Sequence, residues 1–537
     1  SGAWFTAAVA LLAAVPVFIV LVQALTAGWA PDGDRAVVAA RAYDVLSAHP
    51  PLVGAFSTTT FLTGVNTYSP GPLLYWLLAV PAHLPGLWAL PTTMAVVNGA
   101  SVVGSVLLAR RRGGPVFMVV AAAAIVVMLS SLPTDLPSDI WAPSAPLLPF
   151  TLLVIVSWSV ACGDAQLLPL AVLLASFTAQ CHIAYLLPAL LLLAVGVAGL
   201  LTSTRLHGWV GETVASAHRV RRSASVALLV AVVCWSFPVL DQILGSTGSP
   251  GHGNLGHLLR AIGARGQTFG FGAATHAIAH TVGLVPWWLR GYLDPEAKTF
   301  EALGAVSRLA AVSTGVFGIA VVVCVVLGWR RRRLDIVFAC AVTAVLIGAV
   351  GALTVSFPQR NPFSYGYSSW WVGPAGMWAW VLLGWSVVAL APSRRRAVVP
   401  ARAVLPAITA TAVVAMPVLG LKTRWHAIYP QEYPALRAVM ALVRARVPDR
   451  GPVLMVGRAF GFDAAIVYEL RRRGLGVGIA SSFADELGTS YAPAGRRFAQ
   501  TLEVGDGTGL PQPAQVIGQV TMHTTPPRTA TLGLKSS

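Results

Sequence analysis

Long apolar runs constrain this chain more than any other feature of its sequence. Residues 3–27, 183–201 and 335–355 carry almost no charge, and each is close to the ~20 residues that a helix needs to cross a bilayer. Of the 537 residues, 56% are hydrophobic and 11% are charged, whereas a soluble domain is about one-quarter charged. The sequence therefore predicts a polytopic α-helical membrane protein.

The positions of the basic residues orient the predicted spans. Arg clusters at 110–112, 219–222, 330–333 and 394–396 follow alternate spans and thus fall on one side of the membrane. The positive-inside rule makes that side cytoplasmic, so the net charge of +17 reports topology and not nucleic-acid binding. We predict about eleven transmembrane helices in the plasma membrane: 3–27, 87–109, 115–131, 146–162, 165–181, 183–201, 225–244, 304–328, 335–355, 369–391 and 400–420.

The polar segments then lie outside the cell, together with the C-terminus. We expect a transmembrane module over 1–420, with its first external loop at 28–86. Residues 421–505 alternate helical and strand patterns, which predicts a small external α/β domain. Residues 506–537 are rich in Gly, Pro and Thr, a composition typical of a poorly ordered tail.

Carboxylates are scarce, and several of them occur in the first two external segments. Residues 34–48 have the pattern of an amphipathic helix lying on the membrane surface, with Asp34 at its start and Asp44 near its far end. Asp135 and Asp139 lie in the next external loop. If the two segments meet, they form a general base, a metal site or both. The alternatives are that Asp34 only caps the helix and that the loop acids are solvated.

Other polar residues lie at the membrane boundary. Gln180 and His182 separate two apolar runs, and they either line a cavity or form a short external turn. External arginines can bind a lipid phosphate in a bidentate manner or simply contact headgroups; the candidates are Arg265, Arg290 and Arg360. Four tryptophans beside spans are expected to be interface anchors, namely Trp287, Trp288, Trp370 and Trp371.

The order of several short motifs resembles the GT-C superfamily of membrane glycosyltransferases. These motifs are Asp34 with the helix running to Asp44, His49-Pro50-Pro51-Leu52, and Tyr68-Ser69-Pro70-Gly71-Pro72-Leu73. Trp141-x-Pro143 and Gln180-x-His182 look like actinobacterial members of this class. The chain is similar to the protein O-mannosyltransferase, aminoarabinose-transferase and arabinofuranosyltransferase group over its first six spans. It departs from the family's acid pair, because Arg35 follows Asp34.

The resemblance implies a GT-C-like fold and an inverting transfer of a sugar, arabinofuranose or mannose, from a polyprenyl-phosphate donor. The acceptor would be an envelope glycan, lipid or protein on the external face. By this resemblance Asp34 is the general base, and Asp44 is a second catalytic carboxylate. We expect substrate-binding roles for the remaining polar candidates, which are Arg41, His49, Tyr68, Asp139, Gln180, His182, Arg265, Arg290 and Arg360. No metal ligands are assigned, although a divalent metal at the acids stays open.

Two other functional classes compete with this interpretation. A lipid or sugar transporter would place charges within its spans and show paired broken helices, whereas the acids here gather outside the membrane. An envelope glycan polymerase or ligase would use the same external side, and the long loop 245–303 leaves room for one. A non-catalytic scaffold follows if Asp34 is only a helix cap.

Overall fold

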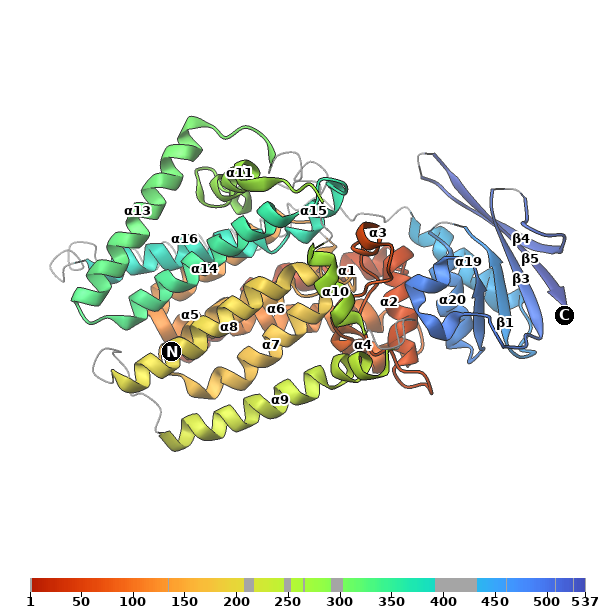
Figure 1. The fold of residues 1–537 in the computed structure, drawn as a ribbon, viewed down its shortest axis with the longest axis horizontal. Helices are drawn as coiled ribbons and strands as arrows, with labels where there is room; N and C mark the ends of the chain where they lie inside the picture. The colour runs from red at the N-terminus through yellow and green to blue at the C-terminus, as the bar shows by residue number, and fades with distance from the viewer. Residues whose placement is uncertain are drawn as a thin grey trace.

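The computed structural model defines a helical bundle followed by a small α/β domain (Figure 1). The structure describes residues 2–133, 135–206, 217–245, 253–263, 266–290, 303–391, 432–459, 461–507, 509–524 and 526–536.

The predicted spans are present as apolar helices wherever the structure describes them. Within the described residues, seven helices are long and apolar enough to cross a membrane, and α6 and α7 are shorter. The predicted span 400–420 lies outside the described residues, so the count of eleven is not confirmed. The helices are α1 (Gly2–Thr26), α5 (Ala89–Ser130), α6 (Leu147–Ala161), α7 (Leu168–Cys181), α8 (Leu186–Arg205), α9 (Ala217–Leu244), α13 (Arg308–Arg330), α14 (Leu334–Ser356) and α16 (Val372–Leu390).

Two predicted spans, 87–109 and 115–131, belong to the single 42-residue element α5. Gly114 interrupts this element with a φ of 79°, a backbone region that glycine enters without steric cost. Pro115 follows and has no N–H to continue the hydrogen-bond ladder. The break therefore separates two helical halves at the arginine cluster 110–112.

Aromatic side chains fill the centre of the bundle. Trp158, Trp370, Trp371 and Trp378 are each at most 1% exposed. Trp287 and Trp288 are also buried, so the expectation that the pairs at 287–288 and 370–371 anchor the protein at the membrane interface is wrong. Each pair packs against other helices of the core instead, because burying the large apolar surface of an indole ring is favourable.

The polar segments between the spans form short elements. The first of them, α2 (Gly33–Asp44), lies between α4 and α20 of the C-terminal domain (Figure 1). Its apolar face is thus covered by protein and not by lipid, since Ala36, Val37 and Ala40 are each at most 5% exposed. The other helices are α3 (Thr60–Thr63), α4 (Leu73–His83), η1 (Leu136–Ser138), η2 (Ala165–Leu167), η3 (Ile183–Tyr185), α10 (Asn254–Gly263), α11 (Gly270–Val282), η5 (Trp287–Leu289) and α15 (Phe363–Ser368).

The C-terminal domain is a five-stranded mixed sheet with strand order β2-β1-β3-β5-β4. β1 pairs in parallel with β2 and β3, whereas β5 is antiparallel to β3 and β4. Residues after 505, for which composition predicts a poorly ordered tail, form β4 and β5. β5 pairs with β3 on one side and with β4 on the other, and its Ala530 and Leu532 are buried. The elements are α19 (Tyr433–Arg446), β1 (Val453–Gly457), α20 (Asp463–Arg472), β2 (Val477–Ala480), α21 (Phe483–Leu487), η7 (Thr489–Tyr491), β3 (Gln500–Asp506), β4 (Gln515–Met522) and β5 (Arg528–Ser536).

Candidate functional site

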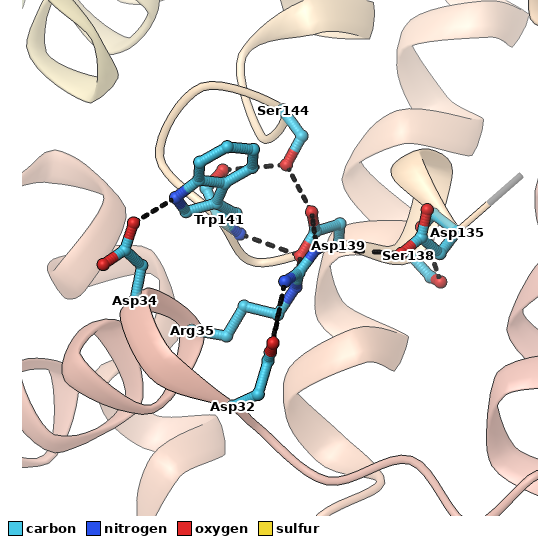
Figure 2. Close-up of polar contacts among 8 residues, drawn as sticks. All are labelled: Asp32, Asp34, Arg35, Asp135, Ser138, Asp139, Trp141 and Ser144. Carbon is cyan, nitrogen blue, oxygen red and sulfur yellow. Dashed lines mark hydrogen bonds and ion pairs between the residues drawn. The ribbon is translucent and has the colours of Figure 1, made fainter. Parts of the chain in front are cut away.

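The first turn of α2 presents charged side chains where the bundle meets the C-terminal domain. Asp32 precedes the helix with extended backbone and makes no side-chain capping hydrogen bond. Successive helix residues are rotated by about 100°, so Asp34 and Arg35 point in different directions (Figure 2). The carboxylate of Asp34 accepts a hydrogen bond from the Trp141 indole at 2.9 Å. Within the described residues, this geometry gives no support to a purely capping role for Asp34.

Arg35 is the centre of a buried ion-pair cluster (Figure 2). Its Nε and Nη2 donate to the two carboxylate oxygens of Asp139 at 2.7 and 3.0 Å. Its Nη1 donates to Asp32 at 3.1 Å, and the carboxylate of Asp135 lies 3.7 Å from Nη2. The two acidic segments, around Asp34 and around Asp139, therefore do meet. They meet around a guanidinium, whose planar fork matches a carboxylate in a bidentate manner.

The segment 135–144 is held rigidly by further bonds. Ser144 Oγ donates to Asp139 at 2.8 Å, and the backbone N–H of Trp141 donates to the same carboxylate at 3.0 Å. The Asn98 amide of α5 donates to the Pro137 carbonyl at 2.8 Å, which fixes η1 to the bundle. Asp139 thus orients the loop that carries the Trp141 indole.

The acids form no metal site of the usual composition. In the described ranges, no three His, Cys, Asp or Glu side chains gather as a set that could hold a metal ion. The position that a cation would take among Asp32, Asp135 and Asp139 is filled by the Arg35 guanidinium.

Asp34 differs electrostatically from its neighbours. Its side chain is exposed, yet surrounding protein desolvates the carboxylate and raises its pKa, while the hydrogen bond from Trp141 opposes the shift. The negative charges of Asp32 and Asp139 raise this pKa further, and Arg35 lowers it. Solvent access combined with a raised pKa is what a general base requires.

Aromatic rings border Asp34 on the side of Trp141. The Trp141 ring lies 5.1 Å from that of Tyr367 and 5.6 Å from that of Trp370, between centroids. The Arg35 guanidinium lies 5.7 Å from the Trp141 ring. Tyr367 in turn contacts the ring of His182 at 5.9 Å. An aromatic wall of this kind suits the apolar face of a sugar or a prenyl chain.

Asp44 lies at the opposite end of α2 and is fully engaged. Arg471 Nη2 lies 2.8 Å from one carboxylate oxygen, and Tyr491 donates to the other at 2.7 Å. Arg41 donates to the same carboxylate at 3.0 Å and to Ser490 at 3.2 Å. Both predicted site residues at this end, Asp44 and Arg41, therefore join α2 to the C-terminal domain.

His49 and Tyr68 occupy different environments. His49 is exposed in the loop after α2. The Tyr68 hydroxyl donates to the Asp485 carbonyl of α21 at 2.7 Å, and burial raises the pKa of this phenol to about 12. The Tyr68 backbone N–H donates to Asn254 at 2.8 Å, so this residue ties the first external loop to α10 and to the C-terminal domain.

Gln180 lies in the last turn of α7, and His182 follows that helix and precedes η3 and α8. The Gln180 amide donates to the Cys234 carbonyl of α9 at 2.7 Å. Its Oε1 is buried and has no hydrogen-bond partner among the residues that the structure describes. A side chain on Gly71 would collide with that oxygen. His182 is half-buried, and its Nδ1 accepts from the Ala184 backbone. Only His182 reaches the aromatic side chains that border Asp34.

The predicted phosphate-binding arginines are dispersed. Arg265 lies outside the described residues. Arg290 donates from Nε to the Val285 carbonyl at 2.8 Å and lies 3.3 Å from His280 Nδ1. Arg360 is exposed in the loop between α14 and α15. Backbone hydrogen bonds between 267–269 and 357–359 join this loop to the external segment 245–303.

Sequence reasoning gave Arg35 and Asp32 no role in the site. Their spacing of three residues at a helix start would have indicated an ion pair, which the structure shows. The interactions of Arg471 and Tyr491 with Asp44 leave no local signal, because 427 and 447 residues separate the partners.

Two solved structures resemble this chain over nearly its whole length. One is ArnT from Cupriavidus metallidurans bound to undecaprenyl phosphate, with a TM-score of 0.54 and 13% identity over 97% of each chain. The other is ArnT from the same organism in the apo state, with a TM-score of 0.53 and 12% identity, covering 96% of this chain and 97% of that one. No family model and no curated protein matches the sequence. At this identity the likeness shows the fold alone, and it agrees with the fold expected from the order of motifs.

Proposed function

We propose that this protein is an inverting glycosyltransferase that moves a sugar from a polyprenyl-phosphate donor to an acceptor on the external face of the membrane. The observation that carries the proposal is the environment of Asp34, a solvent-accessible carboxylate with a raised pKa. It lies beside three carboxylates that Arg35 partly neutralises. The fold shared with a protein that binds undecaprenyl phosphate supports the donor class.

In the proposed reaction, Asp34 removes the proton of the acceptor hydroxyl as that oxygen attacks the anomeric carbon. The bond from this carbon to the lipid-phosphate oxygen breaks, and its electron pair leaves with the phosphate. Attack opposite to the leaving group inverts the configuration. The indole of Trp141 fixes the orientation of Asp34 through its 2.9 Å hydrogen bond, and the raised pKa makes the carboxylate a stronger base than an ordinary one.

The departing lipid phosphate needs positive charge, because negative charge develops on it in the transition state. Arg360 is our candidate among the described residues, since it is exposed and precedes α15, the helix that carries Tyr367. Arg290 is bound to a backbone carbonyl and lies beside His280, so we rank it second. For the sugar we propose arabinofuranose or mannose, in line with the actinobacterial resemblance, and for the acceptor an envelope glycan, lipid or protein.

The orientation of the site follows from the arginine clusters. The α13–α14 connection, which carries Arg330–Arg333, lies at the end of the bundle opposite the C-terminal domain (Figure 1). If this end is cytoplasmic, then α2 and the C-terminal domain are extracytoplasmic, as the proposed reaction requires.

Transfer in liposomes tests the proposal. Purified protein is offered polyprenyl-phosphate arabinofuranose or mannose together with an envelope glycan. We expect Asp34→Asn to lower turnover by about 10²- to 10⁴-fold, the usual contribution of a general base. Asp506→Asn, on the exposed end of β3, is the matched control and should keep wild-type turnover.

Near-normal turnover by Asp34→Asn would exclude this residue as the base. Absence of transfer from every donor, with no lipid-linked sugar bound by mass spectrometry, would favour the transporter or scaffold alternatives. Arg360→Ala should raise the donor KM, and an unchanged KM would remove Arg360 from the donor site.

A further inference from the structure

A cavity of about 710 Å³ lies at the junction of the bundle and the C-terminal domain. One side is formed by the end of α1 and by residues 85–88, which lead into α5. The other side is formed by one face of α19 and the last turn of α20. No lining residue belongs to α2 or to the segment 135–144, so this cavity is separate from the site around Asp34.

The side next to the spanning helices is apolar and aromatic. Leu25 and Trp29 lie at the end of α1, and Leu87 and Trp88 lie at the beginning of α5. The Trp88 side chain is 51% exposed. Because one span ends and another begins here, this wall lies at the membrane boundary, where tryptophan side chains are enriched. It can accommodate the first carbons of a lipid chain.

The side next to the C-terminal domain is cationic. Arg437 and Arg444 lie on one face of α19, seven positions apart, and Arg472 and Arg473 lie at the end of α20. Glu469 is the one acid among the lining residues. Four arginines against one carboxylate leave an excess of three positive charges around the cavity.

Some of this charge is already compensated. Arg444 donates to both carboxylate oxygens of Glu469, at 2.8 and 3.1 Å. Arg473 donates to the Val443 carbonyl at 3.0 Å and pairs with Asp449.

The other two cations are less well compensated. Arg472 lies 4.0 Å from Glu469 and donates from Nη2 to the Leu84 carbonyl at 3.5 Å. Its guanidinium lies 5.7 Å from the ring centroid of Tyr468. Within the described part of the chain, Arg437 makes no ion pair, and its Nη1 lies beside Gly28. Arg437 and Arg472 therefore offer charge-assisted donors to a ligand.

We propose that this cavity binds the phosphate head group of a membrane lipid, with the lipid chain against the aromatic wall. Guanidinium groups pair with phosphate oxygens in a bidentate manner. Basic pockets beside spanning helices recognise anionic lipid head groups. The volume lies within the range of about 300–1,000 Å³ typical of small-molecule sites. Phosphate on a phospholipid and phosphate on a polyprenyl chain both have this chemistry. The inference does not depend on catalysis at Asp34.

Two substitutions on α19 form a matched pair for the test. Ala441 lines the cavity and Ala438 does not, yet both are exposed on the same helix and neither side chain makes a hydrogen bond. Ala441→Glu places a negative charge and extra volume inside the cavity, whereas Ala438→Glu places the same group outside it. Arg437→Gln removes one phosphate donor without breaking an ion pair.

Native mass spectrometry of the full chain in detergent is the assay, with phosphatidylglycerol, undecaprenyl phosphate and inorganic phosphate as separate probes. We expect Arg437→Gln to weaken binding of one lipid by about tenfold or more, because it removes roughly one charge-assisted hydrogen bond. Ala441→Glu should weaken binding of the same lipid at least as much, because its negative charge repels the phosphate. Ala438→Glu should bind like the wild type. The lipid that responds identifies the source of the phosphate.

The proposal would be overturned if every variant bound each of the two lipids as tightly as the wild type does. It would also be overturned if the substitutions weakened the binding of inorganic phosphate alone. Undecaprenyl phosphate can also occupy the donor site, so for that probe the expected result is the loss of one bound lipid per chain. Loss of transfer by Asp34→Asn with unchanged lipid binding would separate the two sites. Inactivity of the wild type would leave the lipid measurement valid.

Discussion

Removal of the Arg35 charge should destabilise the junction between the bundle and the C-terminal domain more than any other substitution at the candidate site. Arg35 is buried and lies within 3.7 Å of three carboxylates. Arg35→Gln leaves these carboxylates without their cation. Breaking a single buried ion pair in this way costs about 3–5 kcal/mol, and the shared partner places Arg35→Gln at the upper end of that range.

The energetic coupling can be measured with a double-mutant cycle. Asp139 holds the bidentate bond to Arg35, so Asp139→Asn in the Arg35→Gln background removes one uncompensated charge. We expect it to restore about 0.5–3 kcal/mol, the usual coupling of residues in one ion-pair network. Arg35→Lys keeps the charge but loses the planar fork, and should therefore lie between the wild type and Arg35→Gln.

Unfolding by SDS titration in mixed micelles provides the free energies, and Asp506→Asn serves as a surface control. A loss below about 1 kcal/mol for Arg35→Gln would mean that the cluster is hydrated and screened like a surface ion pair. A double variant no more stable than Arg35→Gln would show that Asp139 is not its main partner. Either result would refute the reasoning from the cluster.

Three further predictions concern other carboxylates. The acid limb of kcat/KM should lie above the ordinary pKa of 3.8, because the surrounding protein desolvates Asp34 and raises its pKa, and activity falls as the pH drops through that raised value. An acid limb at or below 3.8 would contradict this environment. Asp44→Asn removes the buried ion pair with Arg471, so it should lower the free energy of unfolding by about 3–5 kcal/mol and speed proteolytic release of the C-terminal domain. Lost turnover at unchanged stability would instead favour a catalytic role for Asp44. Burial raises the pKa of Asp463 to about 7, so between about pH 4 and 7 this carboxyl binds a proton more often in the folded protein than in the unfolded chain. The free energy of unfolding should therefore fall as the pH rises from about 4 to 7. Asp463→Asn should flatten this pH dependence in a series of thermal unfolding measurements.

The sequence alone predicted those parts of the fold that depend on local pattern. Apolar runs long enough to cross a bilayer identified the helices of the bundle, because burial in lipid requires continuous hydrophobicity; these are α1, α5, α6, α7, α8, α9, α13, α14 and α16. The helix that begins beside Asp34 and the first strands and helices of the C-terminal domain followed from their periodicity. The order of motifs along the chain indicated the GT-C fold.

Tertiary structure alone decided which side chains meet. Arg35 binds Asp139 across 104 residues and Asp44 binds Arg471 across 427, and no short-range rule specifies such pairs. Tertiary packing also places α4 and α20 against the apolar face of α2, and it adds β4 and β5 to the sheet. Local sequence determines which elements form, but the partners of a charge depend on how loops pack. Consequently two acids at the two ends of one helix, which looked alike in the sequence, differ in the structure: Asp44 is buried in ion pairs, and Asp34 is accessible.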